Sequence, residues 1–179
     1  AQENLFLTTG SMLRDADVQR AAEGATRAVF SNAGQLCVSI ERLYVADQVY
    51  DKFVNAFVAR TKAPTLGASQ DWTVDMGSLI SQSQLDTITA HVEDAVSGGA
   101  TLLTGGRPRP DIGPLCYEPT VLEGVTADMA VCREETFGPV VSLYRFAGDD
   151  EAVALANEGR YGLSASIWSA DTRAAKALA

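Results

Sequence analysis

The sequence predicts an α/β domain in which helices flank a mostly parallel sheet. Segments with strand character alternate along the chain with segments that carry apolar residues at helical spacing. The 179 residues, 46% of them apolar, suffice for a single hydrophobic core, and they contain no internal repeats or low-complexity stretches. We therefore expect one domain built around one sheet.

The first half of the chain predicts two helices around a strand. A helix is expected over residues 13–29, with Asp15 and Asp17 as possible caps, and it ends before Gly34. Branched and aromatic residues at 40–46 predict a strand, and Asp47 is expected to cap the second helix. Residues 64–77 are expected to form a surface loop.

The second half predicts a further series of helices and strands. A third helix is expected at 82–96, stopped by Gly98 and Gly99, and Gly and Pro residues mark a turn-rich stretch at 105–114. The other expected elements are strands at 100–103, 116–121, 140–146 and 164–169, a helix at 149–157 and a last helix capped by Asp171.

Residues 1–11 fit this pattern poorly. The stretch from Glu3 to Ser11 resembles a vector-derived or protease-site remnant more than the start of a fold. We therefore expect the domain to span residues 12–179.

Charge and hydropathy exclude several kinds of partner. The chain carries 14 basic and 23 acidic residues, a net charge of -9, and no basic stripe suited to a phosphate backbone. No apolar run approaches the roughly 20 residues that cross a bilayer, and no secretory leader is recognisable. We expect a cytoplasmic protein that binds neither nucleic acid nor membranes.

The three cysteines, Cys37, Cys116 and Cys132, are widely spaced, and the chain has one histidine, His91. This predicts neither a disulfide framework nor a metal site, and it favours reduced thiols. Cys37 follows a helix end and a flexible glycine, in a turn whose amides can stabilise an oxyanion beside a thiolate nucleophile. The alternative for a single cysteine is an inert core residue.

Several segments resemble the aldehyde dehydrogenase superfamily. Residues 30–42, which contain Gly-Gln-Leu-Cys and Arg42, are similar to its active-site segment, and residues 134–140, Glu-Glu-Thr-Phe-Gly-Pro-Val, to its second signature. The resemblance extends over about residues 13–179. Further matching segments, in the family's order, are residues 76–81, 98–106, 119–122 and 161–168.

The resemblance implies roles for individual residues. Cys37 would be the nucleophile, with its own backbone N–H in the oxyanion hole, Glu135 would bind the ribose beside the nicotinamide, and Phe137 would pack near the nicotinamide ring. The implied reaction oxidises a small-molecule aldehyde through a thiohemiacetal and a thioester, with hydride transfer to NAD or NADP. Without the motif, Glu135 would be interpreted as a solvated charge and Phe137 as a core residue.

Two other interpretations remain open. A cysteine hydrolase would pair Cys37 with His91, although a histidine on the surface or face of an amphipathic helix is the commoner case. A non-catalytic interaction domain would leave Cys37 in the core. Arg42, at the start of an apolar strand, is expected to be a partly buried structural residue paired with a carboxylate or a backbone carbonyl.

The family's general base, a glutamate in Glu-Leu-Gly-Gly-Lys, is expected outside this chain. Glu3 stands at the corresponding distance before Cys37, but its neighbours do not match the motif. The coenzyme-binding domain and a C-terminal segment are also expected elsewhere. The chain alone should therefore be inactive and bind NAD or NADP weakly or not at all, while the full-length parent is expected to be a homo-oligomer.

Within the superfamily, the segment around Cys37 resembles NADP-preferring succinate-semialdehyde dehydrogenases. Enzymes of that group tend to have an arginine six residues before the nucleophile, where this chain has Ser31, and often a second cysteine at the position of Ser39. The substrate therefore stays open at this point.

Overall fold

The computed structural model describes residues 8–69, 73–158 and 161–179. Its elements follow one another in the order β1 (Thr8–Met12), α1 (Val18–Phe30), a 3-10 turn (Ser31–Gly34), β2 (Ile40–Ala46), α2 (Tyr50–Thr61), α3 (Gln82–Ser97), β3 (Thr101–Thr104), β4 (Thr120–Glu123), α4 (Ala130–Arg133), β5 (Val140–Phe146), α5 (Asp149–Ala156), β6 (Ser164–Trp168) and α6 (Thr172–Leu178).

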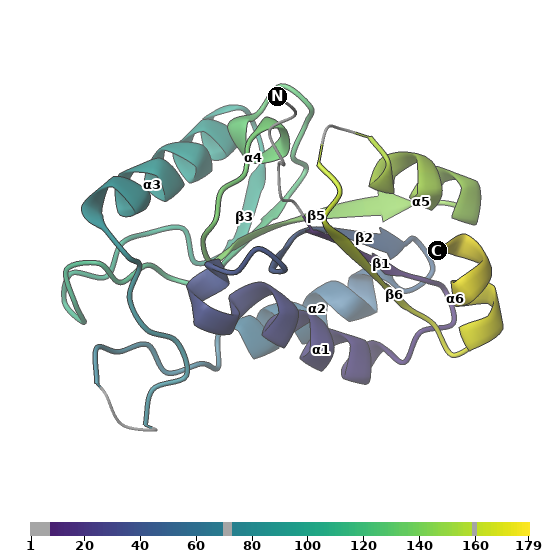
Figure 1. Cartoon of the computed structure of the whole chain (residues 1–179), viewed down its shortest axis with the longest axis horizontal. Helices are drawn as coiled ribbons and strands as arrows, with labels where there is room; N and C mark the ends of the chain where they lie inside the picture. Colours follow the sequence, from purple (N-terminus) through teal and green to yellow (C-terminus); the bar gives the residue numbers. More distant parts are fainter. Residues whose placement is uncertain (1–7, 70–72, 159–160) are drawn as a thin grey trace.

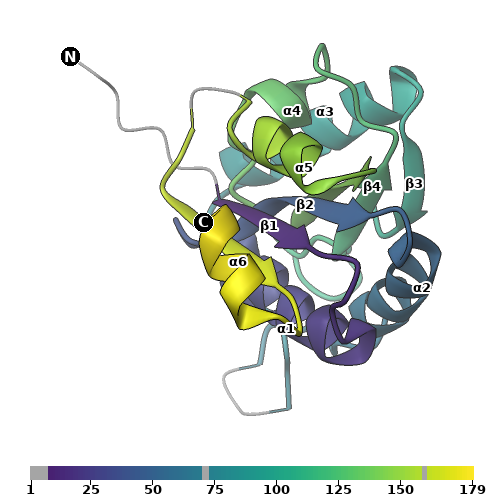
Figure 2. The same cartoon turned by 90° about the vertical axis from the view of Figure 1, so that its right-hand side faces the viewer.

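The strands of the described residues form one sheet in the order β3-β4-β5-β2-β1-β6. In this sheet order, each pair of neighbouring strands from β4 through β5, β2 and β1 to β6 is parallel. The edge strand β3 pairs with β4 in the antiparallel direction. Helices α1 and α2 cover one side of the sheet, whereas α3, α4 and α5 lie on the other (Figures 1 and 2). The expected α/β architecture with a mostly parallel sheet is confirmed.

The centre of the sheet is buried on both faces. Every residue of β2 is buried, as are Val140 to Leu143 in β5, and such strands are nearly continuous apolar runs because helices cover both faces. Phe53 and Phe57 of α2 pack against this core, with their rings stacked at a centroid distance of 5.3 Å. The central strands therefore give the loops at their ends a rigid base.

The expected elements match the structure most closely at the centre. Strands β2 and β5 have the predicted bounds, and Asp171 caps α6 by accepting hydrogen bonds from Arg173 N and Ala174 N. Asp17 caps α1, which begins five residues later than predicted, at Val18. The prediction that Asp47 caps α2 is wrong, because Val49 occupies the cap position and makes no side-chain bond there.

The largest difference lies at the start of the chain. Residues 1–7, including most of the expected remnant and Glu3, lie outside the described residues, but Thr8–Met12 form β1. This strand lies between β2 and β6 and pairs in parallel with both. The fold therefore begins before residue 12, because the neighbouring strands satisfy the backbone of this segment although Gly10 interrupts its short strand pattern.

Candidate active site

The loop that carries Cys37, residues 31–39 (the cysteine loop), begins with a left-handed turn of the backbone. Asn32, Ala33 and Gly34 have φ values of 53°, 55° and 70°. A Cβ atom on Gly34 would lie 2.0 Å from the carbonyl oxygen of Gly138. Glycine is therefore required at position 34 twice, by its φ angle and by the close approach of another backbone segment.

A glutamine side chain anchors the cysteine loop to the segment before α3. Gln35 accepts a hydrogen bond from Ile80 N at 2.9 Å, and its amide nitrogen donates to Asn32 O at 3.2 Å and Ser78 O at 3.4 Å. Asn32 donates in turn to Gln35 O at 3.1 Å. The glutamine of the Gly-Gln-Leu-Cys motif thus holds the shape of the loop.

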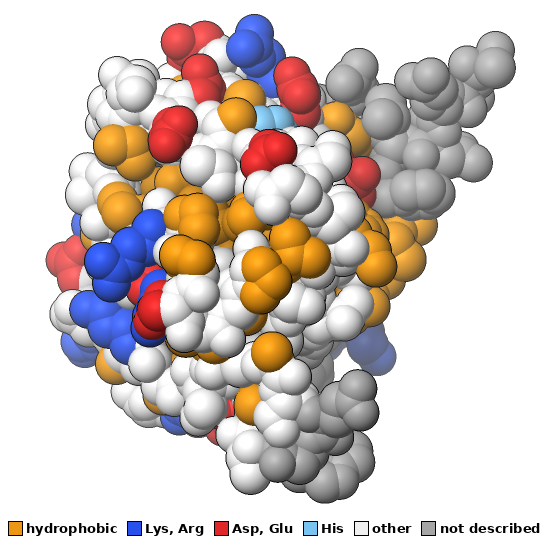
Figure 3. All heavy atoms as spheres, turned by 90° about the vertical axis from the view of Figure 1, so that its left-hand side faces the viewer, with side chains coloured by type: hydrophobic (Ala, Val, Ile, Leu, Met, Phe, Trp, Pro, Cys, Tyr) orange, Lys and Arg blue, Asp and Glu red, His pale blue; other side chains and the backbone are white. Residues whose placement is uncertain are grey.

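Cys37 lies at the exposed tip of a turn closed by the hydrogen bond from Ser39 N to Leu36 O, 2.9 Å. Its neighbours Leu36 and Val38 are 39% and 53% exposed, and Ile80 is 81% exposed. The molecular face at the left of Figure 1 gathers hydrophobic side chains near its middle (Figure 3). Cys37 is therefore an accessible thiol with apolar neighbours, and the expectation of a core cysteine does not fit it.

The other two cysteines have different surroundings. Cys116 is fully buried, and burial raises the pKa of its thiol. Cys132 is partly buried near the end of α4, and its backbone carbonyl accepts a hydrogen bond from Arg42. Of the three thiols, only that of Cys37 is exposed.

Glu135 and Phe137 lie on a second loop, residues 134–139 (the glutamate loop), which joins α4 to β5. This loop and the cysteine loop touch at the contact between Gly34 and Gly138. Gly138 itself leaves no room for a side chain, because a Cβ there would lie 2.3 Å from Ile88 Cδ1 of α3. The two signature segments, about a hundred residues apart in sequence, are thus packed backbone to backbone.

Glu41, the second residue of the buried strand β2, holds the glutamate loop through its carboxylate. Its carboxylate accepts hydrogen bonds from Thr136 N at 3.0 Å and Phe137 N at 2.9 Å. Glu41 is 7% exposed, and burial raises its pKa to about 7 although the two backbone bonds act to lower it. A carboxyl group that titrates near neutral pH therefore lies beneath this loop.

Helix α3 holds the glutamate loop from the other side. Gln84 donates to Thr136 O at 2.8 Å and Phe137 O at 3.0 Å. The ring of His91 contacts Thr136 Oγ1 through Nδ1 at 3.1 Å and lies 3.6 Å from a Glu134 carboxylate oxygen through Nε2. Of the two positions expected for His91, the surface or a helix face, the structure shows the second: it lies on a buried face of α3, 7% exposed, and packs against the glutamate loop.

The side chains of Glu135 and Phe137 are both partly exposed. Within the described part of the chain, the Glu135 carboxylate accepts no hydrogen bond, and partial burial raises its pKa. Phe137 adopts a left-handed backbone with φ of 48°, which is uncommon for a bulky residue. A carboxylate with free acceptor capacity and an aromatic ring therefore flank Thr136 on a strained, well-tethered loop.

Arg42 is buried, as expected, and has a structural role. It is 7% exposed and donates to backbone carbonyl oxygens, to Glu158 O at 3.2 Å and to Cys132 O. These bonds tie β2 to the ends of α4 and α5. Arg42 therefore supports the region behind the loops rather than the site itself.

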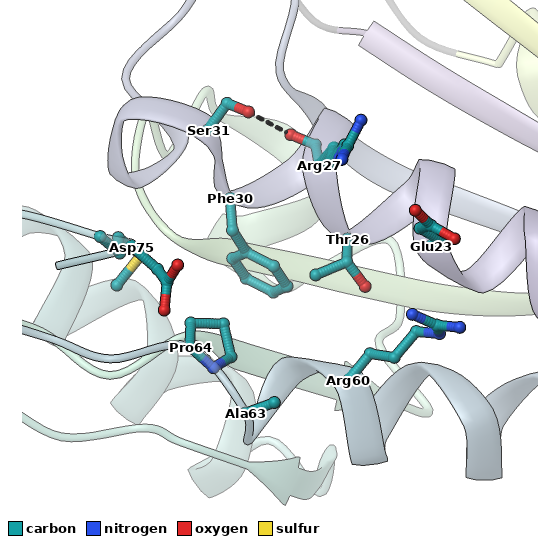
Figure 4. A pocket seen from close by; sticks show the side chains of 10 residues that line it. Glu23, Thr26, Arg27, Phe30, Ser31, Arg60, Ala63, Pro64 and Asp75 are labelled. Atoms are coloured by element: carbon teal, nitrogen blue, oxygen red, sulfur yellow. Dashed lines mark hydrogen bonds between the residues drawn. The ribbon is translucent and has the colours of Figure 1, made fainter. Parts of the chain in front are cut away.

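A pocket of about 380 Å³ lies between α1 and the end of α2 (Figure 4). Ser31, on its rim, donates its hydroxyl to Arg27 O at 2.6 Å. The basic side chains that line the pocket are Arg27 and Arg60, and the acidic ones are Glu23 and Asp75. Ser31, the residue six positions before Cys37, thus provides no charge, but an arginine one helical turn earlier lines the same pocket.

Two kinds of feature are absent from the described residues. No helix there is both long enough and apolar enough to cross a membrane. No group of three or more His, Cys, Asp or Glu side chains is placed to hold a metal ion.

The motifs predicted Cys37, Glu135 and Phe137 as candidate site residues, but the residues that hold the two loops were not predicted. Glu41, Gln84 and Gln35 act through contacts with segments remote in sequence. One signal was available: Glu41 and Arg42 are charged residues inside a strand that is otherwise apolar, and charged side chains are rarely buried without specific partners.

The chain is similar to known proteins over most of its length. A Mycobacterium tuberculosis protein with the provisional name succinate-semialdehyde dehydrogenase [NADP(+)] 2 is 51% identical over 166 residues, 93% of this chain and 32% of its own length. Solved structures of succinate-semialdehyde dehydrogenase from Burkholderia pseudomallei and of betaine aldehyde dehydrogenase from Staphylococcus aureus in complex with NAD+ each superpose on 98% of the chain with a TM-score of 0.91. They are 36% and 32% identical to it, and the chain covers 36% and 35% of their lengths.

The chain spans about a third of the length of these relatives. Residues 10–179 match the family model described as the aldehyde dehydrogenase family, which is nearly the whole chain. The chain therefore belongs to the aldehyde dehydrogenase family.

Proposed function

We propose that this chain is the nucleophile-bearing catalytic domain of an NAD(P)+-dependent aldehyde dehydrogenase, and that Cys37 is its nucleophile. The observation that carries the proposal is the direct contact of two loops at Gly34 and Gly138. One of these loops exposes a thiol, and the other presents Glu135 and Phe137. The relatives that are named as aldehyde dehydrogenases support the same activity.

The proposed chemistry uses each of these groups for one task. The Cys37 thiolate adds to the carbonyl carbon of an aldehyde, and the Cys37 backbone N–H stabilises the oxygen that gains charge. Glu135 would accept hydrogen bonds from the hydroxyl groups of the nicotinamide ribose, and Phe137 would restrain the flat nicotinamide ring. The bound coenzyme supplies the hydride acceptor. Water then releases the carboxylic acid from the Cys37 thioester, with a general base that we expect outside the described residues.

Glu135 and Phe137 reach only the nicotinamide end of such a coenzyme. We therefore expect this chain alone to bind NAD+ or NADP+ weakly, because the adenine and phosphate groups need further contacts. Calorimetry with both coenzymes tests this expectation. Micromolar affinity would show that the described residues already contain a complete coenzyme site.

For the substrate, we propose an aldehyde that carries a distant carboxylate, such as succinate semialdehyde. The name of the M. tuberculosis relative supports this class. Arg27, in the pocket beside Ser31, offers a guanidinium that can pair with the carboxylate. In the full-length enzyme, Arg27→Ala should raise KM for succinate semialdehyde at least about tenfold while leaving KM for butanal within about twofold. Equal effects on both aldehydes would remove Arg27 from substrate recognition.

The proposed nucleophile is tested in the full-length enzyme by Cys37→Ala, with Cys132→Ala as the matched control. Cys37→Ala should abolish aldehyde-dependent NAD(P)H formation, whereas Cys132→Ala should retain most of it. Limited alkylation of the wild-type chain, mapped by mass spectrometry, should label Cys37 first and the buried Cys116 last. Full activity in Cys37→Ala, or faster labelling of Cys116 in the folded chain, would contradict the assignment.

A further inference from the structure

We propose that Glu41 is the positioning residue of the glutamate loop: by holding Thr136 N–H and Phe137 N–H at once, its carboxylate fixes where Glu135 and Phe137 stand. This inference rests on the proposed function, because it assigns Glu41 a task in coenzyme placement. Glu41 touches neither coenzyme nor substrate in this view. It acts through the loop.

The geometry matches a carboxylate and no other side chain. Both oxygens of Glu41 are used, Oε2 by Thr136 N at 3.0 Å and Oε1 by Phe137 N at 2.9 Å. An ionised carboxylate accepts at both oxygens, whereas a protonated carboxyl or an amide presents one donor toward one of these N–H groups. Both N–H groups are therefore bound at once only while Glu41 is ionised.

The bonds to Glu41 hold the part of the loop that most needs support. Phe137 has a φ of 48°, a conformation that costs free energy and persists only when several contacts enforce it. Gln84 binds the carbonyl oxygens of the same two residues whose N–H groups Glu41 binds. Losing the Glu41 bonds would leave both of these N–H groups without their carboxylate partner, so that Glu135 and Phe137 could shift while Gln84 and His91 still hold Thr136.

The charges around Glu41 allow its ionisation to change near neutral pH. Glu135 on the loop above disfavours the ionised form, and Arg42 on the same strand favours it. From α3, His91 contacts Thr136 Oγ1 and Glu134 rather than Glu41 itself. Burial is the largest influence and raises the Glu41 pKa to about 7. As pH falls through 7, Glu41 gains a proton and one of the two N–H bonds is lost.

The first test uses this chain without any substitution. In a series of amide NMR spectra between pH 5 and 8.5, the N–H resonances of Thr136 and Phe137 should titrate together, with a midpoint near 7. In Glu41→Gln this shared transition should be absent. Resonances that do not move in the wild type, or that move identically in both proteins, would overturn the proposal whether or not the chain takes part in catalysis.

The second test measures hydride transfer by single-turnover kinetics in the full-length enzyme. Glu41→Gln imitates the protonated state, so the rate ratio of wild type to Glu41→Gln should be near 1 at pH 5.5 and at least about tenfold at pH 8. Because Cys37 ionises in both proteins, the effect of its ionisation on the rate cancels in this ratio. Glu123→Gln, a partly buried carboxyl group that accepts from the Tyr50 hydroxyl at 2.9 Å, serves as the control with a flat ratio.

The outcomes of the two tests separate this inference from the proposed function. A rate ratio that is constant with pH in an active enzyme would overturn the role of Glu41 alone. Absence of aldehyde-dependent NAD(P)H formation in the wild type at every pH would overturn the proposed function. The amide titration would still decide whether Glu41 governs the loop. If Glu41→Gln does not fold, the wild-type titration near pH 7 remains the deciding measurement.

Discussion

The two loops that meet at Gly34 and Gly138 are held in different ways. The cysteine loop keeps its shape through left-handed backbone, a glycine with no space for a Cβ and a glutamine that binds its own loop. The glutamate loop is held by side chains from β2 and α3, namely Glu41, Gln84 and His91. A loop fixed by steric fit is insensitive to ionisation but intolerant of added atoms, whereas a loop fixed by polar side chains responds to charge.

Because the cysteine loop is fixed by steric fit, we expect Gly34→Ala to have the largest effect on stability and activity. A left-handed alanine costs about 1–2 kcal/mol, and its Cβ would also lie 2.0 Å from Gly138 O, so the two loops must move apart. We expect the free energy of unfolding to fall by about 2–4 kcal/mol and the kcat/KM of the full-length enzyme by more than about a hundredfold. Denaturant melts and steady-state kinetics measure these changes.

Gly77→Ala is the matched control, because nothing lies within 4 Å of a Cβ at that exposed glycine. It should change stability by less than about 0.5 kcal/mol. If Gly34→Ala behaved like Gly77→Ala, the cysteine loop would not depend on steric fit.

On the glutamate loop, Glu135→Gln should slow hydride transfer by up to about a hundredfold, because a nicotinamide held by a weaker ribose contact strays from the aligned position. The thermal melt should not change. Glu134→Gln, at a side chain that is 60% exposed, is the neighbouring control, and it should alter the rate by less than about threefold. Equal rates of hydride transfer in wild type and Glu135→Gln would remove Glu135 from the proposed site.

The glutamine tethers allow the two loops to be perturbed separately. Gln35→Ala frees the cysteine loop from Ile80, and Gln84→Ala frees the carbonyls of Thr136 and Phe137. We expect Gln35→Ala to change the alkylation rate of Cys37 and Gln84→Ala to raise KM for the coenzyme, each by about tenfold, as for one or two lost hydrogen bonds. If each variant changed both the alkylation rate of Cys37 and the KM for the coenzyme, the two loops would move as a unit.

The smallest expected effect is a dependence of stability on pH that only the glutamate loop should show. Because the folded pKa of Glu41 lies near 7, above its ordinary value of 4.5, its contribution to stability is complete below pH 4.5 and is lost as pH rises through 7. Between pH 8 and pH 6 the wild type should gain about 1 kcal/mol relative to Glu41→Gln. Parallel stability curves from denaturant melts would contradict a raised pKa.

The sequence predicted the fold best where burial on both faces leaves a clear pattern. Strands β2 and β5 are such segments, and their bounds agree with the structure. Strand β1 was missed because the segment that contains it resembles a vector-derived remnant, and because Gly10 and Ser11 interrupt the strand-favouring threonines. Its pairing with β2 and β6, which lie further along the chain, outweighs this weak local pattern. The four-residue helix α4 was missed because it is too short for a periodic pattern.

For the site, short motifs predicted which residues to examine but not what supports them. Cys37, Glu135 and Phe137 follow from local segments, whereas the bond from Phe137 N to Glu41 joins residues 96 positions apart. Burial of His91 could not be predicted either, because an amphipathic helix does not reveal which neighbour covers it. Contacts between distant segments are decided by the packing of the sheet and helices, which local patterns in one sequence do not reveal.

The position of β1 has a consequence for the order of folding. Strand β6 reaches the sheet only through β1, and the Ser169 hydroxyl donates to the Asp15 carboxylate 154 residues away in sequence. Closing so long a segment of chain costs entropy before any contact compensates for it. We expect β6 and α6 to dock last during refolding, after β2 and β5 have formed a nucleus with α1 and α2. Until then β1 presents an unpaired edge, where a second unfolded chain can add a strand and start aggregation.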